Sequence, residues 1–189
     1  MGARMHPPEQ PLTLFTVGHG TRSTDELLAV LRSGGVERVV DVRRFPGSRR
    51  HPHLGREPLA AALAAAGVGY EWAGEALGGR RSGVEPSRHP ALRNAAFRAY
   101  ADHMDSPEFG VALARLLDEV RAGPPPAVMC AETLWWRCHR RLIADAAVLA
   151  GTPVTHLVDE RTATPHELAR EARPDEEGRP VYDVGVLPT

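Results

Sequence analysis

Apolar positions along the chain alternate between short β-favouring runs and longer stretches with helical spacing. Five short runs predict buried strands, at 12–17, 37–42, 68–72, 127–130 and 154–158. Five stretches in which apolar residues recur every three or four positions predict helices, at 24–33, 58–66, 91–104, 107–121 and about 137–150. Because strands and helices largely alternate, we expect a single-domain three-layer α/β/α sandwich with a mainly parallel sheet of about five strands.

The residues around these elements set the limits of the domain. Ser23 and Glu26 have the spacing of a capping box at the start of the first helix, and Gly34 ends that helix. The segment 74–90 is rich in Gly, Arg, Ser and Pro, as in functional lids and disordered insertions. We expect three parts: a flexible lead-in at 1–11, one α/β domain at 12–162, and a C-terminal helix or tail at 163–189.

Composition and net charge exclude several classes of protein and partner. The 189 residues carry a formal net charge of −1, so no bulk attraction to nucleic acid or to an anionic membrane is expected. Two cysteines cannot build a disulfide framework, and no apolar run is long enough to span a membrane. We therefore expect a cytoplasmic protein with reduced thiols and no membrane partner. All 23 Lys and Arg residues are arginine, which coding bias explains except at local clusters.

Three polar segments directly follow predicted strands. They are Gly18-His19-Gly20, Asp41-Val42-Arg43 and Cys130-Ala131-Glu132. In parallel sheets ligands bind outside the carboxyl ends of the strands, where the strand order switches. We expect the three segments to meet in one crevice.

The first of these segments occupies the place of a dinucleotide fingerprint but lacks its third glycine. Gly18 and Gly20 leave backbone N–H groups free near a helix N-terminus, which is a general anion site, and Arg22 could add a side-chain contact. A tight turn followed by a good helix cap explains the same residues without a ligand.

The second segment opens a basic stretch. Asp41 and Arg43 lie two residues apart, so a forked salt bridge could hold the arginine in a fixed orientation. Ser48 and Arg49 follow in a loop that is either solvated or part of a binding surface.

The third segment places a cysteine between a predicted strand and a predicted helix. Cys130 is either a small buried hydrophobe or a thiol whose pKa is lowered by a helix N-terminus and nearby arginines, Arg137 and Arg140 among them. Glu132 and His139 are the available acid–base groups. The spacing from Cys130 to Arg137 is one residue longer than a cysteine-phosphatase loop, so we do not expect a phosphatase.

The remaining chemistry of this stretch stays open. Cys138 shares a helical face with Leu142 and is interpreted as core. A metal site formed by His19, Cys130, Cys138 and His139 is the alternative, although no metal-binding spacing is present. Trp136 either walls a pocket for a flat ligand or covers the edge of the sheet.

Several segments together resemble a known family. They are TVGHGTRS at 16–23, DVRRFPGSR at 41–49, LGG at 77–79, YADHM at 100–104, CAE at 130–132 and WRCHR at 136–140. In this order they are similar to the signature segments of the family of domain of unknown function 488 (DUF488), over about residues 12–160. The resemblance implies a small single-domain α/β protein and no particular activity.

We favour an enzyme, a hydrolase or transferase, that binds an anionic substrate, phosphorylated or nucleotide-like, at the carboxyl ends of the strands. Its expected catalytic residues are Cys130, Glu132 and His139. Its expected binding residues are Gly18, His19, Gly20, Arg22, Asp41, Arg43, Ser48, Arg49, Trp136, Arg137 and Arg140. The alternatives are a non-catalytic nucleotide- or nucleic-acid-binding module and a metal- or redox-dependent protein. The sequence requires no cofactor and leaves a metal possible.

Overall fold

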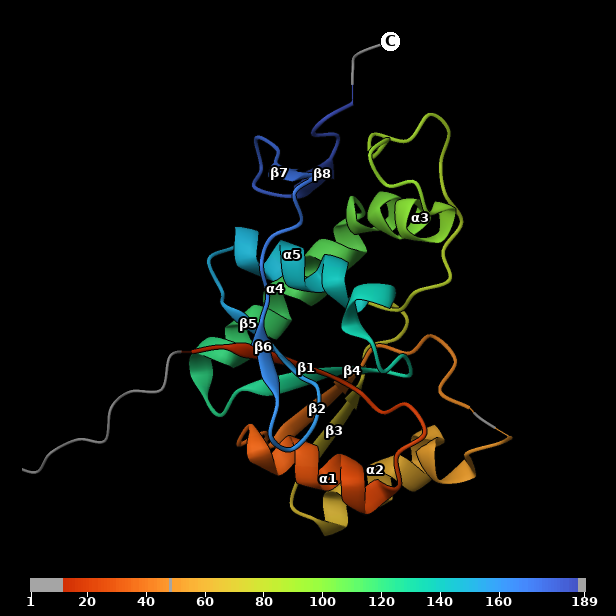
Figure 1. Ribbon diagram of the computed structural model, residues 1–189, viewed down its shortest axis with the longest axis vertical. Helices are drawn as coiled ribbons and strands as arrows, with labels where there is room; N and C mark the ends of the chain where they lie inside the picture. The colour runs from red at the N-terminus through yellow and green to blue at the C-terminus, as the bar shows by residue number, and fades with distance from the viewer. Residues whose placement is uncertain (1–11, 48, 187–189) are drawn as a thin grey trace, which may run out of the picture.

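The computed structural model describes residues 12–47 and 49–186. The predicted lead-in at 1–11 lies outside these residues. A six-stranded sheet with the order β3-β2-β4-β1-β5-β6 forms the centre of the protein (Figure 1). Its strands are β1 (Leu14–Gly18), β2 (Arg38–Asp41), β3 (Gly69–Trp72), β4 (Pro126–Cys130), β5 (Val154–Leu157) and β6 (Ala163–Pro165). The first five are parallel and β6 is antiparallel, which confirms the predicted mainly parallel sheet.

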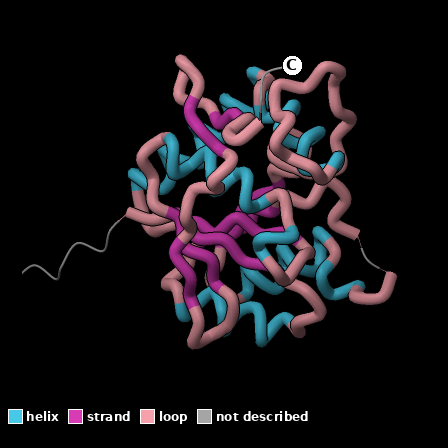
Figure 2. Tube along the Cα trace, turned by 45° about the horizontal axis from the view of Figure 1, so that its top comes forward, coloured by secondary structure: helices cyan, strands magenta, loops and turns pink. Residues whose placement is uncertain are grey.

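Five helices cover the two faces of the sheet. They are α1 (Thr24–Ser33), α2 (Arg56–Ala65), α3 (Ala95–Met104), α4 (Pro107–Ala122) and α5 (Arg140–Leu149). Helices α1 and α2 lie below the sheet in Figure 1, and α3, α4 and α5 lie above it. Figure 2 shows the same arrangement from another side, with the strands between two groups of helices. The predicted three-layer sandwich is therefore confirmed, and none of the helices in the described part of the chain is long and apolar enough to cross a membrane.

Local side chains explain where the helices begin. Ser23 and Glu26 form the predicted capping box, with Ser23 N donating to Glu26 Oε2 at 2.7 Å. Helix α3 begins later than predicted because Asn94 Oδ1 accepts from Ala96 N at 2.9 Å and caps the helix there. Helix α5 also begins later, because Trp135–Arg137 form a 3₁₀ turn, η2, and the next residue is extended. A second 3₁₀ turn, η1 (Pro52–Leu54), precedes α2.

The alternation of β4 decides which side chains reach which layer. Ala127 and Met129 pack in the core cluster with α1 and α2, whereas Val128 and Cys130 pack in the cluster with α3, α4 and α5. Cys130, the last residue of the strand, therefore faces the layer that contains α5.

The sequence predicted a helix or a tail after residue 162, and the described residues 163–186 form no helix. Among residues 163–186 the chain forms β6, which extends the sheet beside β5, and then β7 (Ala172–Pro174) and β8 (Pro180–Tyr182), an antiparallel pair. The pair lies at the opposite end of the molecule from α1 and α2 (Figure 1). These strands are too short to show a period in the sequence, and their burial depends on α3 and α5.

A buried chain of hydrogen bonds ties this C-terminal part to the sheet. Thr16 Oγ1 lies 2.6 Å from His156 Nδ1, His156 Nε2 lies 2.9 Å from His166 Nδ1, and His166 Nε2 lies 2.9 Å from Asp145 Oδ1. The hydroxyl of Tyr182 donates to Asp145 Oδ2 at 2.9 Å. Strands β1, β5 and β8, helix α5 and the segment after β6 thus share one polar network, which fixes the tail as part of the domain.

This network predicts a pH dependence of stability. Burial, followed by the neighbouring His166 and Arg140, lowers the pKa of His156 to about 3 from 6.5. Between these values the unfolded chain binds a proton that the folded protein excludes, so stability falls as the pH falls from about 6.5 to about 3. Glutamine does not titrate, so in His156→Gln the free energy of unfolding in urea should depend less on pH. The difference from wild type over this range should be no more than about 5 kcal/mol. Identical slopes in wild type and variant would contradict this assignment.

Candidate active site

The carboxyl ends of β1, β2 and β4 converge because β4 lies between the other two strands. The register pairs Gly18 with Cys130 and Asp41 with Met129. Beyond the strands, His19 N donates to Cys130 O at 3.0 Å and continues the ladder. The connections after β1 and β4 leave toward opposite faces of the sheet, to α1 and to α5, which is the switch in strand order where ligands bind.

A cavity of about 580 Å³ opens at this edge of the sheet. Its lining residues come from the three strand ends, from the segment that follows β3 and from α3: Gly20, Thr21, Arg43, Arg44, Phe45, Gly79, Arg80, Ala96, Phe97, Tyr100, Cys130, Ala131, Glu132, Thr133, Arg137, Cys138 and His139. We call this cavity the crevice. It contains all three residues predicted as catalytic and, of those predicted for binding, Gly20, Arg43 and Arg137.

Asp41 and Arg43 form the predicted forked salt bridge beside the crevice. Arg43 Nε donates to Asp41 Oδ1 at 2.9 Å and Arg43 Nη2 to Asp41 Oδ2 at 2.6 Å, with both side chains buried. The hydroxyl of Tyr70 donates to the same carboxylate at 2.7 Å. Burial and this hydrogen bond raise the pKa of Tyr70, so the phenol stays protonated.

Both ring nitrogens of His19 have hydrogen-bond partners beside this salt bridge. Its Nε2 lies 3.0 Å from Arg43 Nη1 and its Nδ1 lies 2.9 Å from Gly20 O, so the ring donates at Nδ1 and accepts at Nε2. Burial, followed by the charge of Arg43, lowers the pKa of His19 and keeps the ring neutral. His19 supports Arg43 and the turn; it does not line the crevice as a ligand would.

Arg22, predicted as an anion contact, has a similar supporting position. Its Nη1 donates to Gly18 O and its Nη2 donates to Val158 O, so the guanidinium joins the ends of β1 and β5. Arg140 is buried and donates from Nη2 to Glu132 O at 2.7 Å, which holds the loop after β4. Both arginines are directed at backbone carbonyls rather than at the crevice.

Cys130 lies on the floor of the crevice, with its sulfur within 4.8 Å of the ligand atoms of Cys138 and His139. A hydrogen bond from the thiol of Cys138, then those from His139 and from the backbone N–H of Glu132, lower the pKa of Cys130 well below its ordinary value, against the opposing effect of burial. The bond to Cys130, together with burial, raises the pKa of Cys138. The pair therefore favours a thiolate at Cys130 and a thiol at Cys138.

His139 is packed from two sides. Its ring contacts that of Tyr100, with centroids 4.8 Å apart, and Gly79 approaches so closely that an added Cβ would lie 3.0 Å from His139 Nδ1. The buried Nε2 of His139 has no hydrogen-bond partner among the described residues. The ring thus has one nitrogen whose hydrogen-bonding capacity the described residues leave unused.

Two further arginines were missed by sequence reasoning. Arg44 and Arg80 line the crevice, and each guanidinium lies 5.9 Å from the ring centroid of Phe45. Arg80 has φ +57°, an uncommon conformation for a non-glycine residue. The segment that carries it is held to α3, where the hydroxyl of Tyr100 donates to Leu77 O at 2.7 Å. The adjacent pairs Gly78–Gly79 and Arg80–Arg81 were the signal in the sequence.

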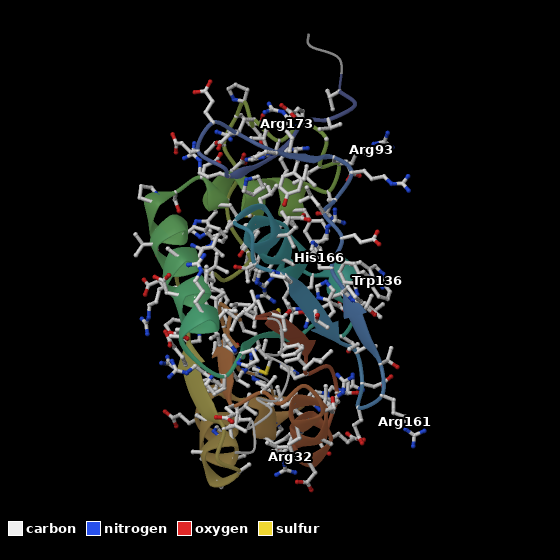
Figure 3. All side chains as sticks on the ribbon, turned by 90° about the vertical axis from the view of Figure 1, so that its left-hand side faces the viewer. Arg32, Arg93, Trp136, Arg161, His166 and Arg173 are labelled. Carbon is white, nitrogen blue, oxygen red and sulfur yellow. The ribbon has the colours of Figure 1, made fainter. Side chains whose placement is uncertain are left out.

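The structure leaves other predicted residues outside the crevice. Trp136 is 48% exposed and lies at the surface (Figure 3). Arg49 is exposed, and neither it nor Trp136 lines the crevice. Ser48 lies outside the described residues. Gly18 lies beneath the crevice, where its missing side chain admits the loop after β4: an added Cβ would lie 2.0 Å from Glu132 O.

Three groups on the floor of the crevice could surround one metal ion. The ligand atoms of Cys130, Cys138 and His139 all lie within 4.8 Å of one another, with Cys138 Sγ 3.7 Å from His139 Nδ1. Two sulfurs and one imidazole suit a soft divalent ion such as Zn²⁺. His19, the fourth member of the predicted metal set, does not belong to this group.

The fold and the crevice define a small α/β protein with a thiol site at a switch in strand order. The chain belongs to the family described as domain of unknown function DUF488, whose model matches residues 23–147. That range contains Asp41, Cys130 and His139 and confirms the family expected from the sequence segments. Searches of curated proteins and of solved structures found no significant match.

The close approach at Gly18 predicts a sharp difference between two glycine variants. Gly18→Ala would press a methyl group against Glu132 O and Thr133 Cα, so we expect a loss of about 1–3 kcal/mol in unfolding free energy and slower alkylation of Cys130. Gly47→Ala is the control, because nothing lies within 4 Å of an added Cβ there. Equal unfolding and alkylation in the two variants would contradict the packing described.

Proposed function

We propose that the protein is an enzyme that uses Cys130 as a nucleophile on an anionic substrate bound in the crevice. The proposal depends on the position of Cys130: its sulfur lies within 4.8 Å of Cys138 Sγ and of a ring nitrogen of His139, in a cavity that arginines line. A structural cysteine needs neither the donors nor the opening. A hydrolase or a transferase that forms a covalent thio-intermediate fits this arrangement.

The other residues of the crevice supply binding and proton transfer. Arg44, Arg80 and Arg137 line the crevice without a side-chain hydrogen bond to the backbone of the described residues, unlike Arg22 and Arg140, and they bind the anion. His139 transfers the proton of the leaving group, and Glu132, which accepts from Leu134 N at 3.1 Å, is the second acid–base group.

The aromatic lining narrows the substrate class. Phe45, which is 65% exposed, and Phe97 both line the crevice beside the arginines. A flat ring can stack on such side chains while its phosphate meets the guanidinium groups. A nucleotide-like or other phosphorylated molecule of the cytoplasm satisfies both requirements.

The proposal predicts the reactivity of the two cysteines. Iodoacetamide should modify Cys130 with an apparent pKa well below the free-thiol value of about 8.5, and a nucleoside monophosphate should slow the reaction. Cys138→Ala, which removes the main donor, should raise this pKa, whereas Cys138→Ser keeps a donor and should raise it less. Rates measured against pH, with the modified peptide identified by mass spectrometry, test this.

Arginine variants provide the matched controls. Arg80→Gln and Arg137→Gln should weaken protection by the nucleotide about tenfold each. Arg161→Gln should leave it unchanged, because Arg161 points away from the body of the protein near β6 (Figure 3). Protection that is absent in wild type, or equal in all three variants, would contradict anion binding in the crevice.

The second candidate is a metal-dependent enzyme, favoured by the compact group of Cys130, Cys138 and His139. It predicts one equivalent of zinc in protein purified without chelator, and alkylation of Cys130 that accelerates when a chelator removes the metal. The thiol enzyme predicts little bound metal and an alkylation rate that a chelator does not change. Elemental analysis of the same samples separates the two candidates.

A non-catalytic nucleotide- or nucleic-acid-binding module would use the same arginines with the exposed Phe45 and Trp136. One face of Trp135 is occupied, because it stacks on His156 at a centroid distance of 4.0 Å. Such a module predicts affinity for single strands that falls steeply with salt and does not change in Cys130→Ser. Turnover lost in that variant while nucleotide binding is kept would exclude it.

A further inference from the structure

The second cysteine of the chain has a place in the crevice that the proposed function does not use. Cys138 lies eight positions after Cys130, between η2 and α5, with its backbone extended at φ −120° and ψ 149°. It lines the crevice as well as the core, and its sulfur lies within 4.8 Å of the sulfur of Cys130. The sequence interpretation of Cys138 as a core residue explains its burial but not this contact.

We propose that Cys138 is the resolving thiol of Cys130, so that a hydroperoxide entering the crevice is reduced and the two cysteines end as an intramolecular disulfide. This inference rests on the proposed function in one respect, since it takes Cys130 as the reactive thiol of the site. It adds a second reaction, reduction of a hydroperoxide, and a reversible oxidised state.

The reaction balances in two steps. The thiolate of Cys130 attacks one oxygen of the hydroperoxide: an S–O bond forms, the O–O bond breaks, and the leaving oxygen takes a proton and departs as an alcohol, or as water from hydrogen peroxide. The thiol of Cys138 then attacks the sulfur of the sulfenic acid at Cys130. An S–S bond forms, the S–O bond breaks, and hydroxide leaves with the proton of Cys138 as water. The two sulfurs lose two electrons in total, and the peroxide gains them.

The geometry meets the requirements of each step. Cys130 is 9% exposed at the floor of an open cavity, which admits a molecule as small as hydrogen peroxide. A resolving cysteine must lie beside the nucleophile before oxidation, since otherwise a second peroxide converts the sulfenic acid irreversibly to sulfinic acid. The ligand atoms of Cys130 and Cys138 lie within 4.8 Å of each other, and a disulfide requires about 2.0 Å between the sulfurs.

The approach of the two sulfurs requires movement only in the connection between them. Residues 131–139 contain a single 3₁₀ turn and no strand. Arg140 holds the start of this connection through Glu132 O and Thr133 O, while α5 anchors its end. The disulfide would remove the nucleophile from the crevice and return it on reduction by a dithiol.

Mass spectrometry of the full chain tests the inference directly. Protein treated with chelator and then with one equivalent of hydrogen peroxide should lose two hydrogens and gain no oxygen. Trypsin cuts after Arg137, between the two cysteines, so the disulfide is identified as a linked pair of peptides in the unreduced digest. Alkylation of Cys130 should fall about tenfold or more after the peroxide and return fully with dithiothreitol.

The variants separate the possible outcomes. Cys138→Ser should form a sulfenic acid at Cys130 that dimedone traps, and excess peroxide should carry it to sulfinic acid, which dithiothreitol does not reverse. Cys130→Ser should not react at Cys138. Wild type that gains oxygens as fast as Cys138→Ser, with no linked peptides, would overturn the inference while leaving Cys130 reactive and anion-protected. Failure of the proposed function has a different signature: Cys130 would react with neither peroxide nor iodoacetamide.

Discussion

The insertion of β4 between β1 and β2 is the constraint on which the site depends. It brings to one edge of the sheet three chain segments that together span more than a hundred residues of the sequence, and it pairs Cys130 with Gly18. The strand spacing leaves no room for a side chain at Gly18, where the carbonyl of Glu132 approaches. The loop after β4 therefore turns toward α5, and Cys138 and His139 come to lie beside Cys130.

A buried salt bridge supports the side of the crevice that the end of β2 forms. Asp41 and Arg43 are buried together, with His19 and Tyr70 completing the hydrogen bonds of the pair. Removing one partner of such a pair leaves an uncompensated buried charge and costs about 3–5 kcal/mol. The crevice is thus built on a buried polar base, and Arg44, Arg80 and Arg137 line its wall.

Local patterns in the sequence were sufficient for the five parallel strands and for the meeting of three strand ends at one crevice, because strand ends in a parallel sheet converge by geometry. They were also sufficient for the Asp41–Arg43 pair, whose partners are two residues apart. They did not show that Arg22 and Arg140 donate to backbone carbonyls, since a sequence does not tell whether a guanidinium meets a carbonyl or a ligand. Arg80 and Phe97 were missed because the segment after β3 reaches the crevice only through its tertiary contacts with α3, such as that of Tyr100 with Leu77 O.

We propose that a reactive Cys130 and an anion share the crevice. A crystal structure of the reduced protein soaked with a nucleoside monophosphate tests this most directly. We expect the phosphate between Arg44, Arg80 and Arg137, near Cys130 Sγ, and the base beside Phe45 or Phe97. A nucleotide bound elsewhere, or a metal ion held by Cys130, Cys138 and His139 in place of a free thiolate, would contradict it.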